Sequence, residues 1–237
     1  MKTKAILGLV VAVTLSACGG GGDGGINNVD PQGFWHDTGS DGRSVDTLVL
    51  GDTRYFAIYS ANGTVSDMVQ GTLSVNGNDI SDTASIDFSL GGTVAAASLS
   101  GSVIEKQTLS ATVSKSNVSN SFTASYDPSY DNAPTTVEVV GTWSGTSIGS
   151  TDPATLNIAG DGTFSGTSGA CTFAGSATPK SDGKNVFEGT ITYTSSSCGV
   201  VAGTSVPFDA AVSGNRMLAA GVNATRAVAF AFLGTRQ

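Results

Sequence analysis

The chain has 237 residues, 32 of them glycine, and its eleven lysines and arginines face nineteen aspartates and glutamates. The formal net charge of −8 argues against nucleic acid or an anionic membrane face as a direct partner, because both repel an acidic surface. The length suffices for one large β domain or two small ones.

The first eighteen residues have the order of a bacterial export signal. Lys2 and Lys4 form a basic start, residues 5–13 are apolar, and Leu-Ser-Ala leads to Cys18. The apolar run is about half the ~20 residues that a membrane-spanning helix needs, so residues 1–17 are predicted to be a signal peptide. The ending Leu-Ser-Ala-Cys resembles the lipobox of bacterial lipoproteins. This resemblance implies that the chain is cut before Cys18 and that this cysteine is lipidated.

Residues 18–32 are predicted to be a flexible tether. Six of the fourteen residues after Cys18 are glycine, and such a chain has a root-mean-square reach of roughly 20 Å. In the lipoprotein family an aspartate directly after the cysteine favours the inner membrane. Gly19 stands there, so the resemblance implies the cell outer membrane, with the body on the periplasmic face or at the cell surface. Loss of Lys2 and Lys4 with the leader leaves nine basic residues and a net charge of about −10.

The rest of the chain is typical of short antiparallel strands. Apolar residues alternate with polar ones, and no segment keeps a helical apolar spacing. Four dipeptides have the composition of two-residue hairpin turns: Asn62-Gly63, Asn76-Gly77, Asp161-Gly162 and Asp182-Gly183. We therefore predict an all-β, antiparallel fold of two sequence-related halves that form small β-barrels or a β-sandwich.

A faint repeat relates the two halves. Gly33-Phe-Trp35 is followed by Thr47-Leu48, and Gly141-Thr-Trp143 by Thr155-Leu156, with twelve residues from tryptophan to threonine in both. Coincidence in a glycine- and serine-rich chain is the alternative, but tryptophan is rare here and favours a duplication.

A proline- and asparagine-containing segment separates the two halves. Residues 127–134 have the composition of a linker. The predicted N-terminal half is 33–126, and the predicted C-terminal half is 135–237.

The C-terminal half is similar to calycin-type barrels such as lipocalins and avidins, in which Gly-x-Trp opens the first strand. In that family an arginine from a late strand packs across the indole and closes the barrel. Gly141-Thr-Trp143 matches the opening, and Arg226 has the parity of the apolar Val228 and Phe230, with Arg236 on the same parity. The resemblance implies that Trp143 and Arg226 close the barrel; the alternative has Trp143 in an ordinary core and Arg226 at the surface.

Two cysteines remain once Cys18 is assigned to lipid. Cys171 and Cys198 form an even pair in an exported chain, which predicts a disulfide. Two cysteines and one distant histidine do not make a zinc site, so neither a metal nor another cofactor is predicted.

Residues for catalysis are sparse. His36 is the single histidine, and Gly145-Thr-Ser147-Ile-Gly149 matches Gly-x-Ser-x-Gly without the helix that must follow this motif. Carboxylates that could hydrolyse glycosides or hold calcium match no known loop and are interpreted as solubilising. These carboxylates are Asp79, Asp82, Asp87, Asp127 and Asp131. The chain is therefore predicted not to be an enzyme.

Five aromatic residues could form a contact surface. They are Tyr55, Phe56, Tyr59, Tyr126 and Tyr130. Tyr55 and Tyr59 share a strand face that Phe56 opposes, so part of the set is expected to be exposed.

These features predict a lipid-anchored outer-membrane lipoprotein whose non-catalytic β body binds an envelope or extracellular protein. Two alternatives stay open. One is a calycin-like barrel with Trp143 at its closed end and a small lipophilic or glycan ligand in its mouth, which predicts an apolar cavity of several hundred Å³. The other is a structural accessory of an outer-membrane assembly.

Overall fold

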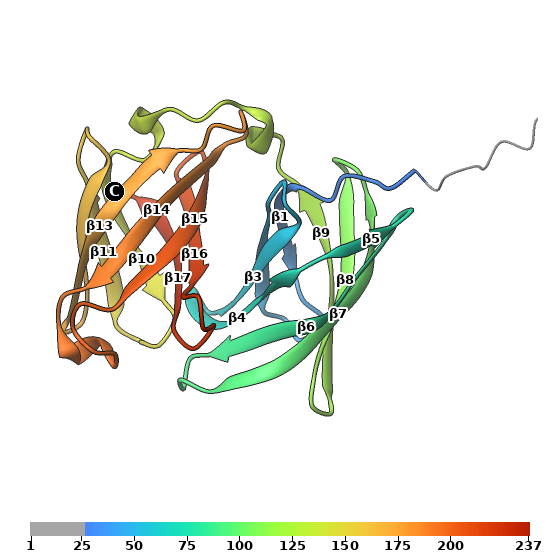
Figure 1. The fold of residues 1–237 in the computed structure, drawn as a ribbon, viewed down its shortest axis with the longest axis horizontal. Helices are drawn as coiled ribbons and strands as arrows, with labels where there is room; N and C mark the ends of the chain where they lie inside the picture. Colours follow the sequence, from blue (N-terminus) through green and yellow to red (C-terminus); the bar gives the residue numbers. More distant parts are fainter. Residues whose placement is uncertain (1–26) are drawn as a thin grey trace, which may run out of the picture.

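A computed structural model describes residues 27–237 of the protein, so the predicted signal peptide and Cys18 lie outside the described residues. Two antiparallel β-barrels lie side by side (Figure 1). The all-β prediction is confirmed. Of its two alternatives, small barrels or a sandwich, the structure has barrels, because the strands of each half close on themselves. No helix in residues 27–237 has the length and apolar character needed to cross a membrane.

The first barrel follows chain order around its circumference. Its strands are β1 (Gly33–Thr38), β2 (Ser44–Val49), β3 (Arg54–Ala61), β4 (Thr64–Thr72), β5 (Ser74–Asn76), β6 (Asp79–Ser89), β7 (Val94–Ile104), β8 (Thr108–Lys115) and β9 (Val118–Tyr126). β1 pairs with β9, and β4 pairs with β6, while the short β5 lies beside the other end of β6. These pairings close eight strands around one core.

The second barrel is a closed meander. Its strands are β10 (Gly141–Ser147), β11 (Pro153–Ile158), β12 (Thr163–Ser168), β13 (Cys171–Pro179), β14 (Val186–Tyr193), β15 (Ser205–Ser213), β16 (Arg216–Val222) and β17 (Ala229–Arg236). Three short 3₁₀ helices lie between strands: η1 (Pro128–Asp131), η2 (Thr136–Glu138) and η3 (Ser196–Cys198). The apolar alternation predicted for this half is confirmed, because alternating residues such as Val206, Phe208 and Ala210 fill the barrel core.

The predicted hairpin turns join neighbouring strands. The glycine of each dipeptide has a positive φ, for example +77° at Gly63 and +82° at Gly162, which only glycine adopts without strain. The local turn chemistry therefore sets the registers of these hairpins.

The two Gly-x-Trp motifs occupy equivalent places, at the start of the first strand of each barrel. The Thr-Leu pairs that accompany them are not equivalent. Trp35 pairs with Thr47, whereas Trp143 pairs with Leu156, so the two alignments differ by one residue. Since a shift of one residue reverses the face of a side chain, this part of the predicted repeat is wrong.

The outer face of β1–β4 packs against the outer face of β14–β17. The contact is apolar and includes Phe34, Leu48, Phe56, Ile58, Met68, Val186, Leu218 and Ala231. Tyr55 and Tyr59 point into the first barrel and are buried, while Phe56 points outward but is covered by the second barrel. The expectation that part of this aromatic set is exposed is therefore wrong for these three residues.

The predicted linker is packed between the barrels. Tyr130 in η1 is buried, and its hydroxyl donates to the Val49 carbonyl at 3.2 Å. On the other side, the backbone amide of Asn185 donates to the Tyr130 carbonyl at 2.9 Å. Residues 127–134 thus hold the two barrels together.

The last residues of the predicted tether lie on the first barrel. The Val29 amide donates to the Gly77 carbonyl at 3.0 Å, and the Gly77 amide donates to the Asn28 side chain at 2.8 Å. Pro31 is buried. The prediction of a flexible coil over 18–32 is therefore wrong for Asn28 and Val29, which bond to the β5–β6 turn, and for the buried Pro31.

Candidate functional site

The interior of the second barrel is filled with side chains. Three aromatic contacts run across it, with ring centroids of Phe164 and Phe208 5.9 Å apart, Phe208 and Phe230 5.7 Å apart, and Phe173 and Phe230 6.5 Å apart. The void among these residues measures about 20 Å³, room for roughly one water molecule. The several-hundred-Å³ cavity expected of a ligand-carrying barrel is not found there.

Trp143 and Arg236 close one end of this barrel. The indole donates to the Val139 carbonyl at 2.7 Å, and the Arg236 guanidinium lies 4.5 Å from the centre of the Trp143 ring. The same guanidinium donates to the Val140 and Glu138 carbonyls. This arrangement satisfies and stacks a charged group that would otherwise be costly to bury.

The prediction that Arg226 closes the barrel is wrong. β17 begins at Ala229, and Arg226 lies before it in a turn with φ +53°, so strand parity does not apply to it. Its guanidinium instead donates to the side chain and carbonyl of Gln70 and to the carbonyl of Ala84, all in the first barrel. Arg226 therefore joins the two barrels.

The first barrel replaces the arginine by a tyrosine. Trp35 pairs with Tyr126 in the register in which Trp143 pairs with Arg236, and the two rings meet edge to face with centroids 5.0 Å apart. The residue opposite the tryptophan therefore has the same register in both barrels but a different side chain.

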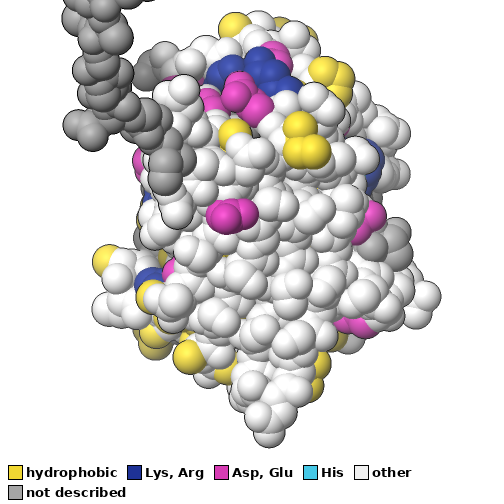
Figure 2. Space-filling view, turned by 90° about the vertical axis from the view of Figure 1, so that its right-hand side faces the viewer, with side chains coloured by type: hydrophobic (Ala, Val, Ile, Leu, Met, Phe, Trp, Pro, Cys, Tyr) yellow, Lys and Arg dark blue, Asp and Glu magenta, His cyan; other side chains and the backbone are white. Residues whose placement is uncertain are grey.

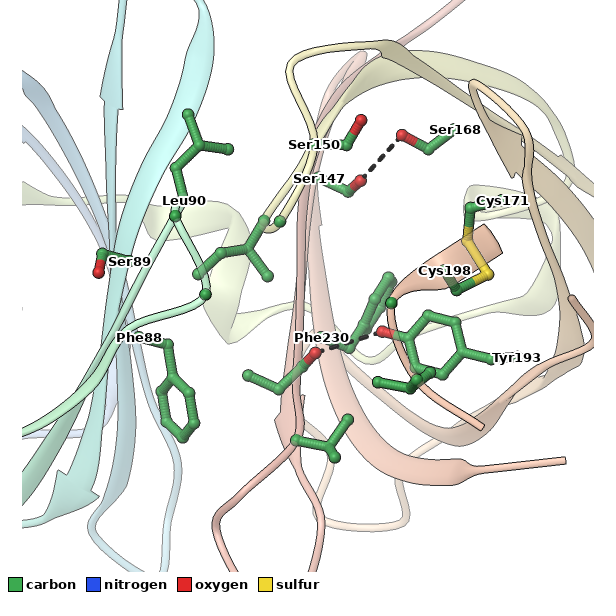
Figure 3. Close-up of a pocket in the computed structure, with 18 of the residues that line it drawn as sticks. Phe88, Ser89, Leu90, Ser147, Ser150, Ser168, Cys171, Tyr193, Cys198 and Phe230 are labelled. Carbon is green, nitrogen blue, oxygen red and sulfur yellow. Dashed lines mark hydrogen bonds between the residues drawn. A yellow bond between two sulfur atoms is a disulfide. The ribbon is translucent and has the colours of Figure 1, made fainter. Parts of the chain in front are cut away.

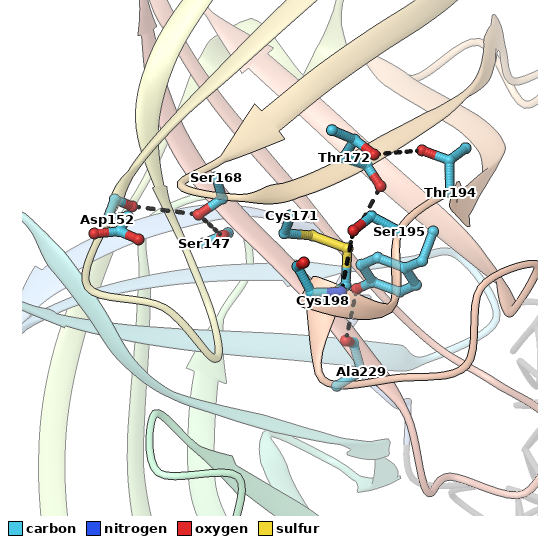
Figure 4. Close-up of a disulfide and its surroundings, with 11 residues drawn as sticks. Ser147, Asp152, Ser168, Cys171, Thr172, Thr194, Ser195, Cys198 and Ala229 are labelled. Atoms are coloured by element: carbon cyan, nitrogen blue, oxygen red, sulfur yellow. Dashed lines mark hydrogen bonds between the residues drawn. A yellow bond between two sulfur atoms is a disulfide. The ribbon is translucent and has the colours of Figure 1, made fainter.

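A disulfide marks the opposite end of the second barrel. Cys171 at the start of β13 is bonded to Cys198 in η3, as the sequence predicts (Figure 4). The Thr194 amide also donates to the Thr172 carbonyl at 2.8 Å. Together these bonds hold the β14–β15 loop at the mouth of the barrel.

A two-stranded arm from the first barrel reaches this mouth. β7 pairs with β8 only from Ser98 onward, so residues 86–97 extend past β8 toward the second barrel (Figure 1). The arm is held along one edge, because residues 86–89 of β6 pair with β4, and near its tip the Leu90 amide donates to the Ser66 carbonyl of β4 at 2.7 Å. Its turn contains Gly91 and Gly92, both exposed.

The arm and the mouth enclose a pocket of about 610 Å³. Phe88, Ser89 and Leu90 lie on one wall, and residues of the barrel mouth lie opposite them (Figure 3). The barrel side includes Ser147, Ile148, Asp152, Ser168, Tyr193, Val228 and Phe230. We call this space the inter-barrel pocket; its volume is typical of ligand-binding clefts.

The pocket is largely neutral. The Tyr193 hydroxyl donates to the Ala229 carbonyl at 3.2 Å, and burial raises the pKa of Tyr193 to about 12. Ser147 donates to Ser168 at 3.3 Å, and Ser168 donates to the Asp152 carbonyl at 3.3 Å (Figure 4). Among the described residues that line the pocket, Asp152 is the only charged side chain.

Ser147 and His36 are not brought together. Ser147 is buried at the end of β10 and is followed by a loop and β11, not by the helix of a nucleophile turn. His36 lies on β1 at the joint between the barrels, and both of its ring nitrogens are occupied. Nδ1 lies 2.5 Å from Asp46 and Nε2 lies 3.2 Å from Asp127. Neither residue is arranged to activate the other.

The cluster around His36 joins elements from both barrels. Arg216 of β16 donates to the Asp46 carboxylate at 2.9 Å. Burial raises the pKa of Asp127, but hydrogen bonds from Ser213 and Ser129 outweigh it and hold that pKa below its usual range. The cluster is therefore a charged contact at the seam of the two barrels.

Three of the other carboxylates singled out in the sequence have structural partners. Asp82 accepts the Thr72 and Ala84 amides at a bulge in β6, and Asp87 is paired with Lys115. Asp131 is paired with Lys106 and Lys184. Within residues 27–237, no three histidine, cysteine or carboxylate side chains are grouped to hold a metal ion.

The outer face of β8 and β9 in the first barrel is covered by polar side chains. Figure 2 shows a surface dominated by side chains that are neither hydrophobic nor charged. Hydroxyl pairs cover it, with Ser110 bonded to Thr123, Thr112 to Ser121 and Ser114 to Ser119. The inter-barrel pocket is the stronger candidate, because it combines depth with apolar walls.

The chain matches no protein-family model, and no curated protein and no solved structure is significantly similar to it.

Proposed function

We propose that the protein is a lipid-anchored outer-membrane lipoprotein whose non-catalytic β body binds a protein partner in the inter-barrel pocket. The observation that carries the proposal is the contrast between two spaces. The pocket measures about 610 Å³, whereas the void inside the second barrel measures about 20 Å³. Binding at the mouth of the second barrel, beside the arm, is therefore favoured over a ligand enclosed inside the barrel.

The position of the pocket suits an anchor at Cys18. The described chain begins beside Gly77, at the end of β6 that carries Asp79, and the pocket lies at the end that carries Ser89. β6 has eleven residues and spans up to about 35 Å at ~3.3 Å per residue. A tether that leaves from the first end therefore joins the body about one strand length away from the pocket.

The walls of the pocket favour contact over catalysis. Leu90, Ile148 and Val228 are half-buried apolar side chains, and the nearby serine hydroxyls bond to each other and to backbone. The exposed Val94 extends the apolar surface onto the arm. Apolar side chains interspersed with hydrogen-bonded hydroxyl groups suit a protein contact.

Photochemical cross-linking in intact cells tests the proposal. A benzoylphenylalanine in place of Leu90 should give one discrete protein adduct, and the same group in place of Thr112, on the outer face of β8, should not. Equal adducts from both positions, or none from Leu90, would overturn the pocket as the partner site. An adduct from Thr112 alone would favour an assembly that packs against the first barrel.

A further inference from the structure

We propose that the inter-barrel pocket recognises an extended peptide segment in which an apolar side chain is followed by a lysine or arginine. This inference rests on the proposed function and names the chemistry of the partner. It follows from three features of the pocket: its apolar walls, its single unpaired carboxylate and the glycine backbone around it.

The apolar side chain would enter between the arm and the barrel mouth. Leu90 stands on the arm, and Ile148, Val200 and Val228 stand on loops of the second barrel, all partly accessible. Tyr193 stays neutral and presents its ring beside them.

The basic side chain would lie beside Asp152. This carboxylate is exposed at the rim of the pocket, and no lysine, arginine or histidine among the described residues lines the pocket. Asp152 is also absent from the ion pairs of residues 27–237, unlike the interface carboxylates Asp46, Asp131 and Asp209, which all have cationic partners. An anionic partner would meet this charge unpaired, whereas a cationic one would neutralise it.

The backbone around the pocket fits an extended chain better than a small amine. Gly91 and Gly92 on the arm and Gly149 and Gly199 on the barrel are exposed, and a Cβ placed at any of them would meet nothing within 4 Å. The amides of Gly92 and Gly199 already donate to the Ser89 and Ser196 carbonyls, so Gly91 and Gly149 supply the donors. These groups can hydrogen-bond the main chain of a segment laid between the two barrels. The net charge of the mature chain, about −10 once Lys2 and Lys4 are removed, also favours a basic partner over an acidic one.

Three blocked hexapeptides provide the test: Ac-GSFKSG-NH₂, Ac-GSFESG-NH₂ and Ac-GSAKSG-NH₂. Each is titrated to millimolar concentration into the isotope-labelled mature chain, and the amide resonances of Gly91, Gly92, Gly149 and Gly199 are followed. The Phe-Lys peptide should shift these resonances and bind more tightly than the other two. Asp152→Asn should weaken it about three- to fivefold, as expected for one exposed charge pair. Glu105→Gln, which removes an exposed charge far from the pocket, should not.

The outcomes separate the two proposals. Equal binding of the Phe-Lys and Phe-Glu peptides in the pocket would overturn the basic-segment inference and leave the pocket as a contact site. Tighter binding of the Phe-Glu peptide would do the same. If none of the peptides shifts the pocket resonances while the Leu90 cross-link forms, the inference fails and the proposed function stands. If both the shifts and the cross-link are absent, both fail.

Discussion

Two arginines ten positions apart have different tasks in this protein. Arg236 stacks on Trp143 and caps the second barrel, whereas Arg226 bonds to Gln70 and Ala84 of the first barrel. The difference arises from the backbone, since Arg236 is in a strand and Arg226 is in a turn with positive φ. Charge and parity alone do not distinguish them.

Arg236→Met should destabilise the second barrel by about 2 kcal/mol or more, because it removes the stack on Trp143 and leaves two carbonyls without their charged donor. Denaturant unfolding followed by Trp143 fluorescence in a Trp35→Phe background measures this. Arg226→Met is the matched control, since its bonds lie at the seam and not in the barrel. Equal midpoints for Arg236→Met and the parent would contradict the capping role.

At the scale of elements, β3 is buried on both faces, which explains why its aromatic residues are not exposed. In β3, Tyr55, Ala57 and Tyr59 fill the first barrel, while Phe56 and Ile58 pack on the second. A strand of this kind has a continuous apolar run instead of an alternating one. The run from Tyr55 to Tyr59 is the signal by which the interface could have been found in the sequence.

The β14–β15 loop depends on its disulfide for its position. Replacing Cys171 and Cys198 together by serine should lower the free energy of unfolding by about 3.5 kcal/mol, in the chain-entropy model for a separation of 27 residues. Amide hydrogen exchange should also accelerate over residues 194–204, which form one wall of the pocket. Unchanged exchange there would show that the other loop contacts are sufficient.

At the scale of the whole molecule, an apolar seam and a set of charged contacts hold the barrels together. The packed linker contributes Asp131, which is paired with Lys106 of the first barrel and Lys184 of the second. Hydrogen bonds from Lys184 and Lys106 lower the pKa of Asp131 to about 2. The ionised carboxylate therefore spans the seam.

This pairing should make the seam sensitive to acid. Because the pKa of Asp131 is lower in the folded state, its ionised form stabilises the fold at pH values above the unfolded pKa of 3.8. This stabilisation is lost as the pH falls toward the folded pKa of about 2. Asp131→Asn should therefore be less stable than the parent at neutral pH, with a difference that shrinks between about pH 4 and pH 2. The difference should also shrink in high salt, because the site is partly exposed. A constant difference across that pH range would contradict the assignment.

The anchor is tested on whole cells. The native chain should carry an acylated mass that Cys18→Ser lacks, and the variant should leave the membrane fraction, because the lipid is the proposed attachment. Added protease then decides the side: cleavage of the body places it at the cell surface, and protection places it in the periplasm. A native chain without acyl mass would contradict the proposed attachment to the outer membrane.

The sequence by itself determined those features that local chemistry controls. Alternating apolar residues, Asn-Gly and Asp-Gly turns, and an even cysteine pair predict strands, hairpins and the Cys171–Cys198 disulfide, because each depends on neighbours in the chain or on one pairing. The tertiary structure decided which arginine reaches Trp143, how the outer face of β3 is covered, and where an arm from one barrel meets the mouth of the other. These depend on contacts between residues distant in the chain, such as Arg226 and Gln70, which no local pattern encodes.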